Sequence, residues 1–252
     1  MNIRALVAEA VGTFILIAFG SLGVVAALSV SSADPTLFGL LATTVVPFAF
    51  GLGLLAAISI GGHASGGHFN PAVTLAALFD GRVTWQSAIG YVVAQIIGGL
   101  AASLLVALTI SRDVVVFTVN RPGNLGGADA FQTELRAFGI EVVLTAVFVA
   151  VILTVTRNYA RQAILIIPLT LVGIHFAAMH LSGASVNPVR SLAPAMVTGT
   201  YDGLWVYLIA PMLGAVVGWG LYALLTPPSD EVSVEIVDDD ELDEELDEED
   251  EA

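Results

Sequence analysis

Six apolar stretches, each long enough to cross a lipid bilayer, place the strictest limit on what this chain can fold into. A helix that crosses about 30 Å of hydrocarbon at about 1.5 Å per residue needs about 20 apolar residues. Such stretches lie at about residues 5–28, 38–60, 85–108, 135–155, 163–181 and 203–225. The first is too long for a signal peptide and is interpreted as an uncleaved span. We therefore predict an all-α membrane protein with six transmembrane helices.

Composition narrows the possible functions. Hydrophobic residues make up 56% of the 252 residues and charged residues 12%, with a mean hydropathy of +0.87, which is typical of a membrane protein. The absence of cysteine excludes a disulfide, a thiolate metal site and a thiol nucleophile. The absence of lysine excludes a phosphate-binding loop that ends in Gly-Lys-Ser or Gly-Lys-Thr. We expect no cofactor, no metal and no nucleic-acid partner.

The acidity of the chain is confined to its C-terminal end. The formal net charge is −15, yet residues 229–252 hold 15 acidic residues and no basic one, and the other eight acidic residues are matched by eight arginines. A segment so rich in like charge and poor in apolar residues favours an extended, solvated state. We predict a membrane domain over residues 1–226 and an acidic disordered tail over residues 227–252. Cation binding or gating by the tail stays open as an alternative.

Two polar segments interrupt the apolar pattern and resemble each other. The first, HASGGHFNPAV, covers His63–Val73, and the second, HLSGASVNPVR, covers His180–Arg190, 117 residues later. Each leads into a short apolar run, and about nine helical residues reach about 14 Å, close to half of the hydrocarbon thickness. Asn70 and Asn187 suit the N-cap position, and the proline after each suits the first helical position. We predict two half-spanning re-entrant helices.

The leaders of these half-helices are expected to be irregular. Non-helical backbone such as GGHASGGHF persists at membrane depth only where protein buries it or a watery cavity solvates it. Both leaders should therefore enter the fold and line a polar path. Pro194, inside the second short run, predicts a bend or an early end of that half-helix.

The repeat extends beyond the two polar segments. Glu9 and Thr13 in the first span correspond to Glu141 and Thr145 in the fourth. With three spans in each half, about residues 1–110 and 131–226, the halves must be inserted upside down relative to each other. The half-helices then enter from opposite faces and meet near the midplane, and both termini lie on one side. Arginines outside the spans divide four to three between the two sides, which is too even to orient the chain.

Paired Asn-Pro-Ala-type motifs behind Ser-Gly, with Glu9 and Glu141 in the first and fourth spans, resemble the aquaporin (major intrinsic protein) family over about residues 4–225. The resemblance implies a passive channel that conducts water in single file down an osmotic gradient and excludes ions and protons. It also implies a homotetramer with one pore per subunit, a multi-pass protein of the lipid bilayer of the cell membrane with cytoplasmic N- and C-termini. Pore diameter, lining groups, an arginine and the dipoles of half-helices give such channels their selectivity.

The same resemblance assigns roles to individual residues. The pore motifs correspond to Asn70, Pro71, Ala72, Asn187, Pro188 and Val189. The narrow selectivity filter, matched by counting from each motif, corresponds to Phe50, His175, Ala184 and Arg190. The pore-lining backbone corresponds to Gly66, Gly67, His68, Phe69, Gly183 and Ser185. Structural support of the polar loops is expected from Glu9, Glu141 and His63.

Several positions bear on the substrate. Phe, His, a small residue and Arg are similar to the water-selective pattern, as is Ser191, whereas glycerol-conducting relatives usually carry glycine at the position of His175. In the opposite direction, Tyr207 and Leu208 stand where water channels often have Phe-Trp, and leucine there is a trait of glycerol channels. Val189 replaces the usual alanine of the second motif and adds bulk beside Asn187. Glycerol or another small neutral solute therefore stays open as an alternative substrate.

Two other classes of protein share some of these sequence features. An ion-coupled secondary transporter also uses inverted repeats and broken helices. Saturable, gradient-driven uptake would favour such a carrier, and linear flux with low temperature dependence would favour a pore. An intramembrane hydrolase is disfavoured because Ser65 lies in HASGG, which fails the G-x-S-x-G pattern at its first position. We expect a protein that is not an enzyme and has no catalytic residue.

Overall fold

The protein is all-helical in the part of the chain that the structure describes. This computed structural model describes residues 2–31, 37–123, 127 and 129–226. The elements in chain order are α1 (Ile3–Ser31), α2 (Leu37–Ser65), α3 (Pro71–Phe79), α4 (Trp85–Thr109), α5 (Arg112–Val115), the 3-10 helix η1 (Val116–Thr118), α6 (Ala130–Asn158), α7 (Ala160–Ala178), α8 (Pro188–Thr198) and α9 (Leu204–Leu225).

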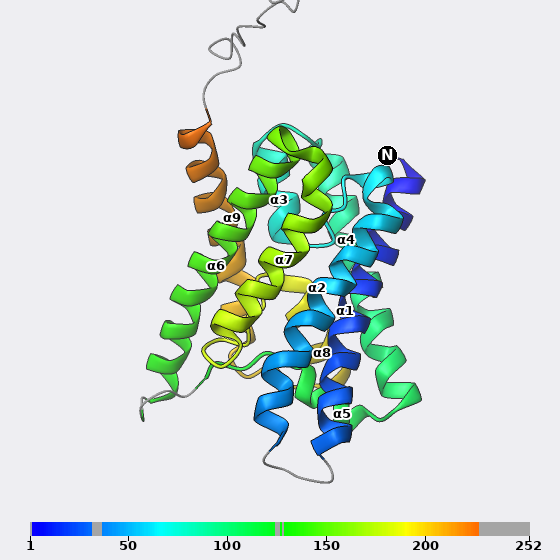
Figure 1. Cartoon of the computed structure of the whole chain (residues 1–252), viewed down its shortest axis with the longest axis vertical. Helices are drawn as coiled ribbons and strands as arrows, with labels where there is room; N and C mark the ends of the chain where they lie inside the picture. The colour runs from blue at the N-terminus through cyan, green and yellow to red at the C-terminus, as the bar shows by residue number, and fades with distance from the viewer. Residues whose placement is uncertain (1, 32–36, 124–126, 128, 227–252) are drawn as a thin grey trace, which may run out of the picture.

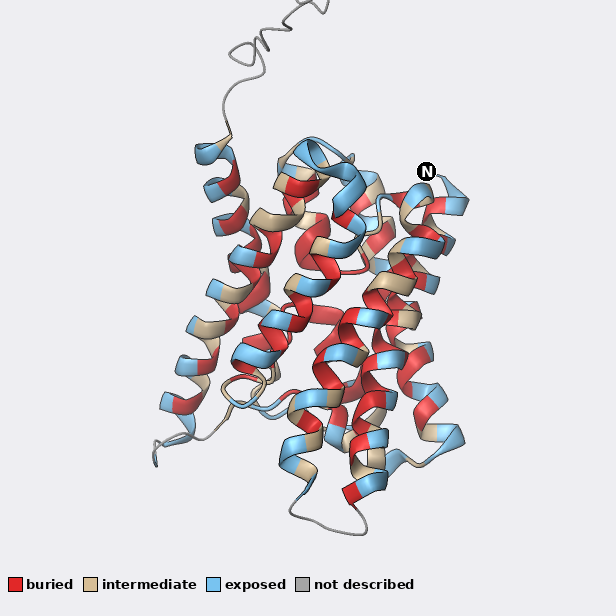
Figure 2. Cartoon of the chain, in the orientation of Figure 1, coloured by how far each residue is buried: buried red, intermediate tan, exposed pale blue. Residues whose placement is uncertain are grey.

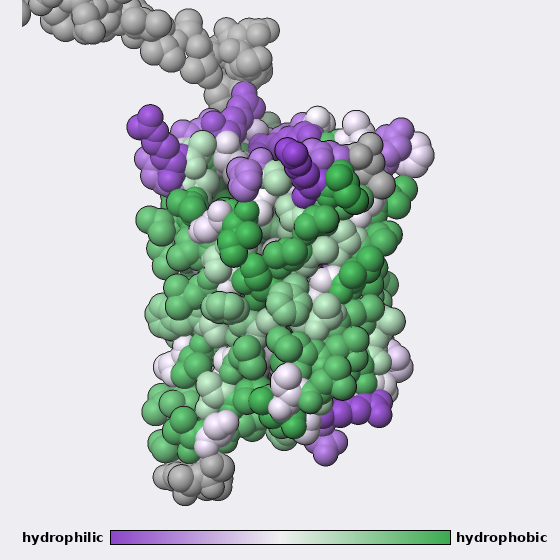
Figure 3. All heavy atoms as spheres, turned by 90° about the vertical axis from the view of Figure 1, so that its right-hand side faces the viewer, coloured by the Kyte–Doolittle hydropathy of each residue, from purple (hydrophilic) through white to green (hydrophobic). Residues whose placement is uncertain are grey.

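Six of these helices can span a membrane. Within the described residues, α1, α2, α4, α6, α7 and α9 are long and apolar enough to do so. Their outward faces are exposed and their inward faces buried (Figure 2). In the space-filling view, hydrophobic side chains form a continuous band below a hydrophilic upper end, and a smaller hydrophilic group lies at the lower right (Figure 3). The predicted six-span fold is therefore confirmed.

The two halves of the chain repeat one packing pattern in opposite orientations. In the first half α1 packs against α2 and α4, and in the second half α6 packs in the same way against α7 and α9. Figure 1 shows that α1 and α6 run in opposite directions, and that α3 and α8 lie toward opposite ends of the molecule. Each half-helix also crosses into the other half, because α3 packs against α9 and α8 packs against α4. This exchange of half-helices joins the halves into one bundle.

Local capping explains where the half-helices begin. The side chain of Asn70 accepts a hydrogen bond from the Ala72 amide at 2.9 Å, and that of Asn187 accepts one from the Val189 amide at 3.0 Å. These bonds satisfy amides that have no partner within the helix. A left-handed Gly199 (φ 77°) ends α8, which suits a residue without a side chain.

Three features differ from the sequence-based expectations. Residues 61–65 of the glycine-rich leader are helical and form the last turn of α2, so only residues 66–70 are irregular. The helix α8 continues through Pro194 to Thr198 instead of ending early. The connection between the halves contains the short elements α5 and η1, which no apolar periodicity indicated. The predicted acidic tail, residues 227–252, lies outside the described residues.

Candidate functional site

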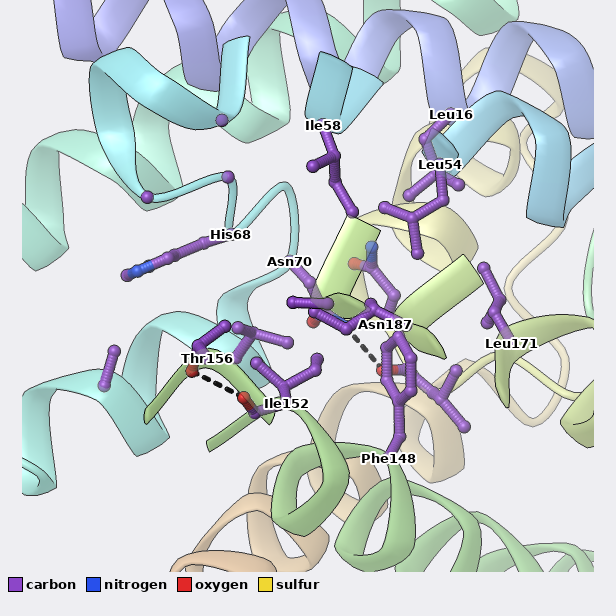
Figure 4. Close-up of a pocket in the computed structure, with 18 of the residues that line it drawn as sticks. Leu16, Leu54, Ile58, His68, Asn70, Phe148, Ile152, Thr156, Leu171 and Asn187 are labelled. Carbon is purple, nitrogen blue, oxygen red and sulfur yellow. Dashed lines mark hydrogen bonds between the residues drawn. The ribbon is translucent and has the colours of Figure 1, made fainter. Parts of the chain in front are cut away.

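The two half-helices meet through their capping asparagines. The Asn70 side-chain amide donates to the Val186 carbonyl at 2.7 Å, and the Asn187 amide donates to the Phe69 carbonyl at 2.9 Å. Each asparagine thus caps its own helix through its oxygen and holds the opposite loop through its nitrogen. The second hydrogen of each amide is left for another acceptor. Figure 4 shows both asparagines beside one space.

A buried carboxylate organises the first polar loop. Glu9 on α1 accepts hydrogen bonds from the amides of His68 (2.9 Å) and Phe69 (2.7 Å). Its oxygens also accept from the Ser65 hydroxyl (2.6 Å) and the Gln95 amide (2.7 Å). Glu9 is fully buried, and these four donors offset the cost of removing its carboxylate from water.

The second loop repeats this arrangement around Glu141 on α6. Its carboxylate accepts from the Ser182 hydroxyl at 2.7 Å and from the amides of Ser185 and Val186, both at 2.8 Å. The position that corresponds to Gln95 is occupied by Pro211, which has no side-chain donor. The two carboxylates therefore hold their loops in the same way, Glu9 through four donors and Glu141 through three.

Two tyrosines support the loops from the last span of each half. The Tyr91 hydroxyl donates to the Ser65 carbonyl at 3.0 Å, and the Tyr207 hydroxyl donates to the Ser182 carbonyl at 2.6 Å. Sequence reasoning missed the roles of Tyr91 and Gln95. The spacing of 116 residues between the tyrosines, one less than the spacing of the motifs, is the signal that could have found the pair.

The loops are held in a strained backbone conformation. Phe69, Ala184 and Val186 have φ values of 50°, 49° and 44°, in the left-handed region that side chains with a Cβ seldom adopt. Such conformations persist where the surrounding contacts over-determine them. Here the amides of Phe69 and Val186 are turned onto the buried carboxylates and their carbonyls onto the opposite asparagines.

A cavity of about 370 Å³ runs beside the crossing point. At one end it is lined by Arg82, Val83 and Thr156, and at the other by Phe50, His175 and Arg190, with both capping asparagines in between. Figure 4 shows apolar side chains around much of this space: Leu16, Leu54 and Ile58 lie above Asn187, Phe148 and Ile152 below it, and Leu171 to its right. The polar loops contribute Ser65, Gly66, Gly67, His68, Ser185 and Val186 to the lining. The lining of the path therefore combines apolar side chains of the spans with polar groups of the two loops.

Three of the four predicted filter residues lie together at one end of this cavity, where Phe50 contacts the other two. The rings of Phe50 and His175 are stacked, with centroids 4.6 Å apart and planes at 20°. The guanidinium carbon of Arg190 lies 4.8 Å from the centroid of the Phe50 ring, within the range of a cation–π contact. The fourth predicted residue, Ala184, is fully buried and is not among the lining residues.

Arg190 is anchored by the connection between the two halves. One guanidinium nitrogen, Nη1, donates to the Thr118 carbonyl at 3.1 Å and to the side-chain oxygen of Asn120. Asn120 also accepts from the Ser191 hydroxyl at 2.7 Å and donates to the Gly183 carbonyl at 3.0 Å. The alternative to a pore role was that Arg190 pairs with a buried acid. No such ion pair of Arg190 occurs among the described residues. Asn120 was missed because it belongs to neither repeat.

Other predicted site residues lie away from the cavity. Val189 packs against Ile17, Ala18 and Ala102 of α1 and α4, so its extra bulk faces the helix bundle and not the path. Gly99 makes room for it, since a Cβ there would lie 2.7 Å from Val189 Cγ1. The remaining motif residues that are buried outside the lining are Pro71, Ala72 and Pro188.

Of the last predicted site residues, two support the polar loops and one has no such role in the described part of the chain. Phe69 is buried and packs on α1 at Gly12, while its carbonyl accepts from Asn187. The Gly183 carbonyl accepts from Asn120. His63 is exposed in the last turn of α2, and no hydrogen bond of its ring occurs among the described residues, so its expected support of the loop is absent there. In the same described ranges, no three His, Cys, Asp or Glu residues group as metal ligands.

Two inverted halves that bring two half-helices together beside a path through the bilayer define a membrane channel. A model of the major intrinsic protein family matches residues 1–222. The chain belongs to this family of channels.

Relatives named as glycerol facilitators and as aquaporins both match most of the chain. It is 38% identical over 219 residues to glycerol uptake facilitator protein-like 6 of Lactiplantibacillus plantarum, covering 84% of this chain and 94% of the relative. It is 37% identical over 234 residues to aquaporin Z of Photorhabdus laumondii, covering 88% and 97%. The X-ray structure of the aquaglyceroporin from Plasmodium falciparum shares the fold, with a TM-score of 0.72, 22% identity, and coverage of 94% of this chain and 99% of that one.

Proposed function

We propose that this protein is a water-selective channel of prokaryotic type that passes water in single file down an osmotic gradient. The observation that carries this proposal is the contact of Phe50, His175 and Arg190 at the end of the cavity. Phe50 packs against both His175 and Arg190, so a solute wider than water would have to displace these buried side chains further than water does. The remaining path, lined by apolar side chains and by polar groups of the loops, suits a file of molecules that hydrogen-bond only to those groups.

Unpartnered polar atoms at this constriction suit a passing water molecule. His175 Nδ1 lies 2.9 Å from the Leu171 carbonyl, which can only accept, so Nδ1 carries a proton and, in the neutral ring, Nε2 is an acceptor. Within the described residues, His175 Nε2 and Arg190 Nε are buried without a partner. A buried polar atom without a hydrogen bond is costly, and water would satisfy an acceptor and a donor together.

Exclusion of ions follows from the charges along the path. The N-termini of α3 and α8 meet at the asparagines, and each helix N-terminus carries a partial positive charge. Arg190 adds a full positive charge at the constriction, and no carboxylate is among the described residues that line the cavity. We infer that cations are repelled at two points, and that the two asparagine amides interrupt the orientation of water on which proton transfer depends.

Glycerol or another small neutral solute is the second candidate, because a relative named as a glycerol uptake facilitator is 38% identical. The two residues that favoured glycerol in the sequence lie away from the cavity. Tyr207 supports a loop through Ser182, and neither it nor Leu208 lines the cavity. His175 and Phe50, which do line it, match the water-selective pattern.

The family resemblance also supports proposals for the oligomeric state, the membrane and the topology of the protein. We propose a homotetramer in the cell membrane, each subunit with its own pore, and both termini in the cytoplasm. The channel domain would comprise residues 1–226, with inverted repeats over about 1–110 and 131–226, and residues 227–252 would form an acidic tail.

Stopped-flow measurements on proteoliposomes test the proposal. The wild-type protein should give rapid shrinkage under a sucrose gradient and no glycerol flux above that of empty liposomes. In the Phe50→Trp/His175→Gly variant, loss of the imidazole leaves an apolar wall beside Arg190, and glycerol flux should rise several-fold. Wild-type glycerol flux as fast as water flux would instead establish the second candidate.

A further inference from the structure

The Phe50 ring rests on a glycine of the first helix. A methyl group built at Gly20 would lie within 2.5 Å of three carbon atoms of that ring, which is far inside van der Waals contact. Gly20 is buried on α1 and is not among the residues that line the cavity. The ring can therefore occupy its place only because residue 20 has no side chain.

The other sides of the ring are also occupied. The His175 ring stacks on it with centroids 4.6 Å apart, and the Arg190 guanidinium carbon lies 4.8 Å from its centroid. Those two neighbours are held in turn by the Leu171 carbonyl and by Asn120. If residue 20 carried a methyl group, the Phe50 ring could move only toward these partners or along the path.

A second glycine of the same helix lies against another aromatic ring. A methyl group at Gly12 would also lie within 2.5 Å of three atoms of the Phe69 ring, whose carbonyl binds Asn187. Gly12 and Gly20 are eight residues apart on α1, so both lie on one helical face, two turns apart. This face of α1 thus positions an aromatic ring at the crossing of the loops and another at the constriction.

We propose that Gly20 is a positioning residue that determines the width and the selectivity of the constriction by setting the depth at which Phe50 lies. This inference rests on the proposed function, because it concerns the same constriction. Gly20 touches no permeating molecule and acts through Phe50. In an apolar pocket a difference of one methylene changes the discrimination between substrates by about 10- to 200-fold, so a displacement of about one methyl group at Phe50 is enough to alter which molecule passes.

The test is Gly20→Ala in proteoliposomes, compared with Gly173→Ala as the matched control. Gly173 lies on α7 near His175, and a methyl group there meets nothing within 4 Å. We expect Gly20→Ala to lower water flux at least threefold while gel filtration and circular dichroism show a folded protein. Gly173→Ala should keep wild-type flux. A folded Gly20→Ala protein with wild-type water flux would overturn the proposal.

Repeating the substitution in a Phe50→Leu variant separates an effect through Phe50 from general damage to helix packing. Leucine at position 50 is shorter than the ring, so the methyl group of Gly20→Ala should alter water flux less than twofold when Phe50→Leu is already present. An equal loss of flux in both backgrounds would refute action through Phe50. If Gly20→Ala alone does not assemble, Phe50→Leu should restore assembly, and failure to do so would also refute it.

Failure of the proposed function would be recognised separately. A wild-type protein that conducts no water would remove the proposed function. In that case the thermal stability and assembly of Gly20→Ala, measured by thermal unfolding and gel filtration with and without Phe50→Leu, still decide whether Gly20 and Phe50 share one space.

Discussion

Replacing Gly99 with alanine tests whether the unusual valine of the second motif is accommodated by α4. A Cβ at Gly99 would lie 2.7 Å from Val189 Cγ1, 3.0 Å from Ile17 Cδ1 and 3.1 Å from Ala193 Cβ. In the other half of the repeat, the corresponding residues are Ala72 and Ala215, both buried in one apolar cluster. The valine–glycine pair and the alanine–alanine pair thus fill equivalent spaces with a different division of volume.

The magnitudes follow from these distances. All three contacts are shorter than ordinary van der Waals contact, and overpacking of this kind costs about 1–3 kcal/mol. Alanine regains up to about 1 kcal/mol of helix propensity over glycine, which offsets part of that cost. Val189→Ala removes two buried methyl groups, at about 0.5–1.5 kcal/mol each by analogy with Ile→Val. In the double variant the new methyl group occupies the vacated space, so the combined loss should be about 1–2 kcal/mol smaller than the sum.

Unfolding in mixed detergent micelles, followed by circular dichroism, measures these free energies. Gly220→Ala on α9 is the matched control, because a methyl group there meets nothing within 4 Å and should not destabilise the protein. If the effects of Gly99→Ala and Val189→Ala are additive within about 0.5 kcal/mol, the two residues do not share one space and the reasoning is refuted.

Three further predictions concern the loops and the pore. Glu141→Ala should reduce the yield of monodisperse protein on gel filtration more than Glu141→Gln, because it leaves the amides of Ser185 and Val186 unpaired at about 1–3 kcal/mol each; equal yields would contradict this. Asn120→Ala should lower both the unfolding temperature and the water flux, since Arg190 loses an acceptor, and unchanged flux would exclude that anchor. Mercurial reagents should leave water flux unaltered because the chain has no cysteine, so inhibition that a thiol reverses would be incompatible with the sequence.

Features encoded in short stretches were predictable from the sequence. The lengths of the apolar stretches indicated the six spans, since hydrocarbon thickness and helical rise determine the number of residues needed. Asn70 and Asn187, each followed by proline, located the starts of the half-helices because capping depends on neighbours within three residues. The repeat of Glu9 at Glu141 indicated corresponding buried carboxylates, and the three spans in each half required inverted insertion.

Features that depend on which faces meet were decided only by the tertiary structure. The leader continued as helix to Ser65, a residue whose hydroxyl and carbonyl bind partners on other spans, and no local pattern indicates those partners. Val189 turned away from the path because Gly99, on another helix, leaves a space there. Asn120 became the anchor of Arg190 although it lies outside both repeats. Sequence by itself determined the spans, caps and paired motifs, which are local; the width of the pore depended on contacts between residues far apart in the chain, which only packing brings together.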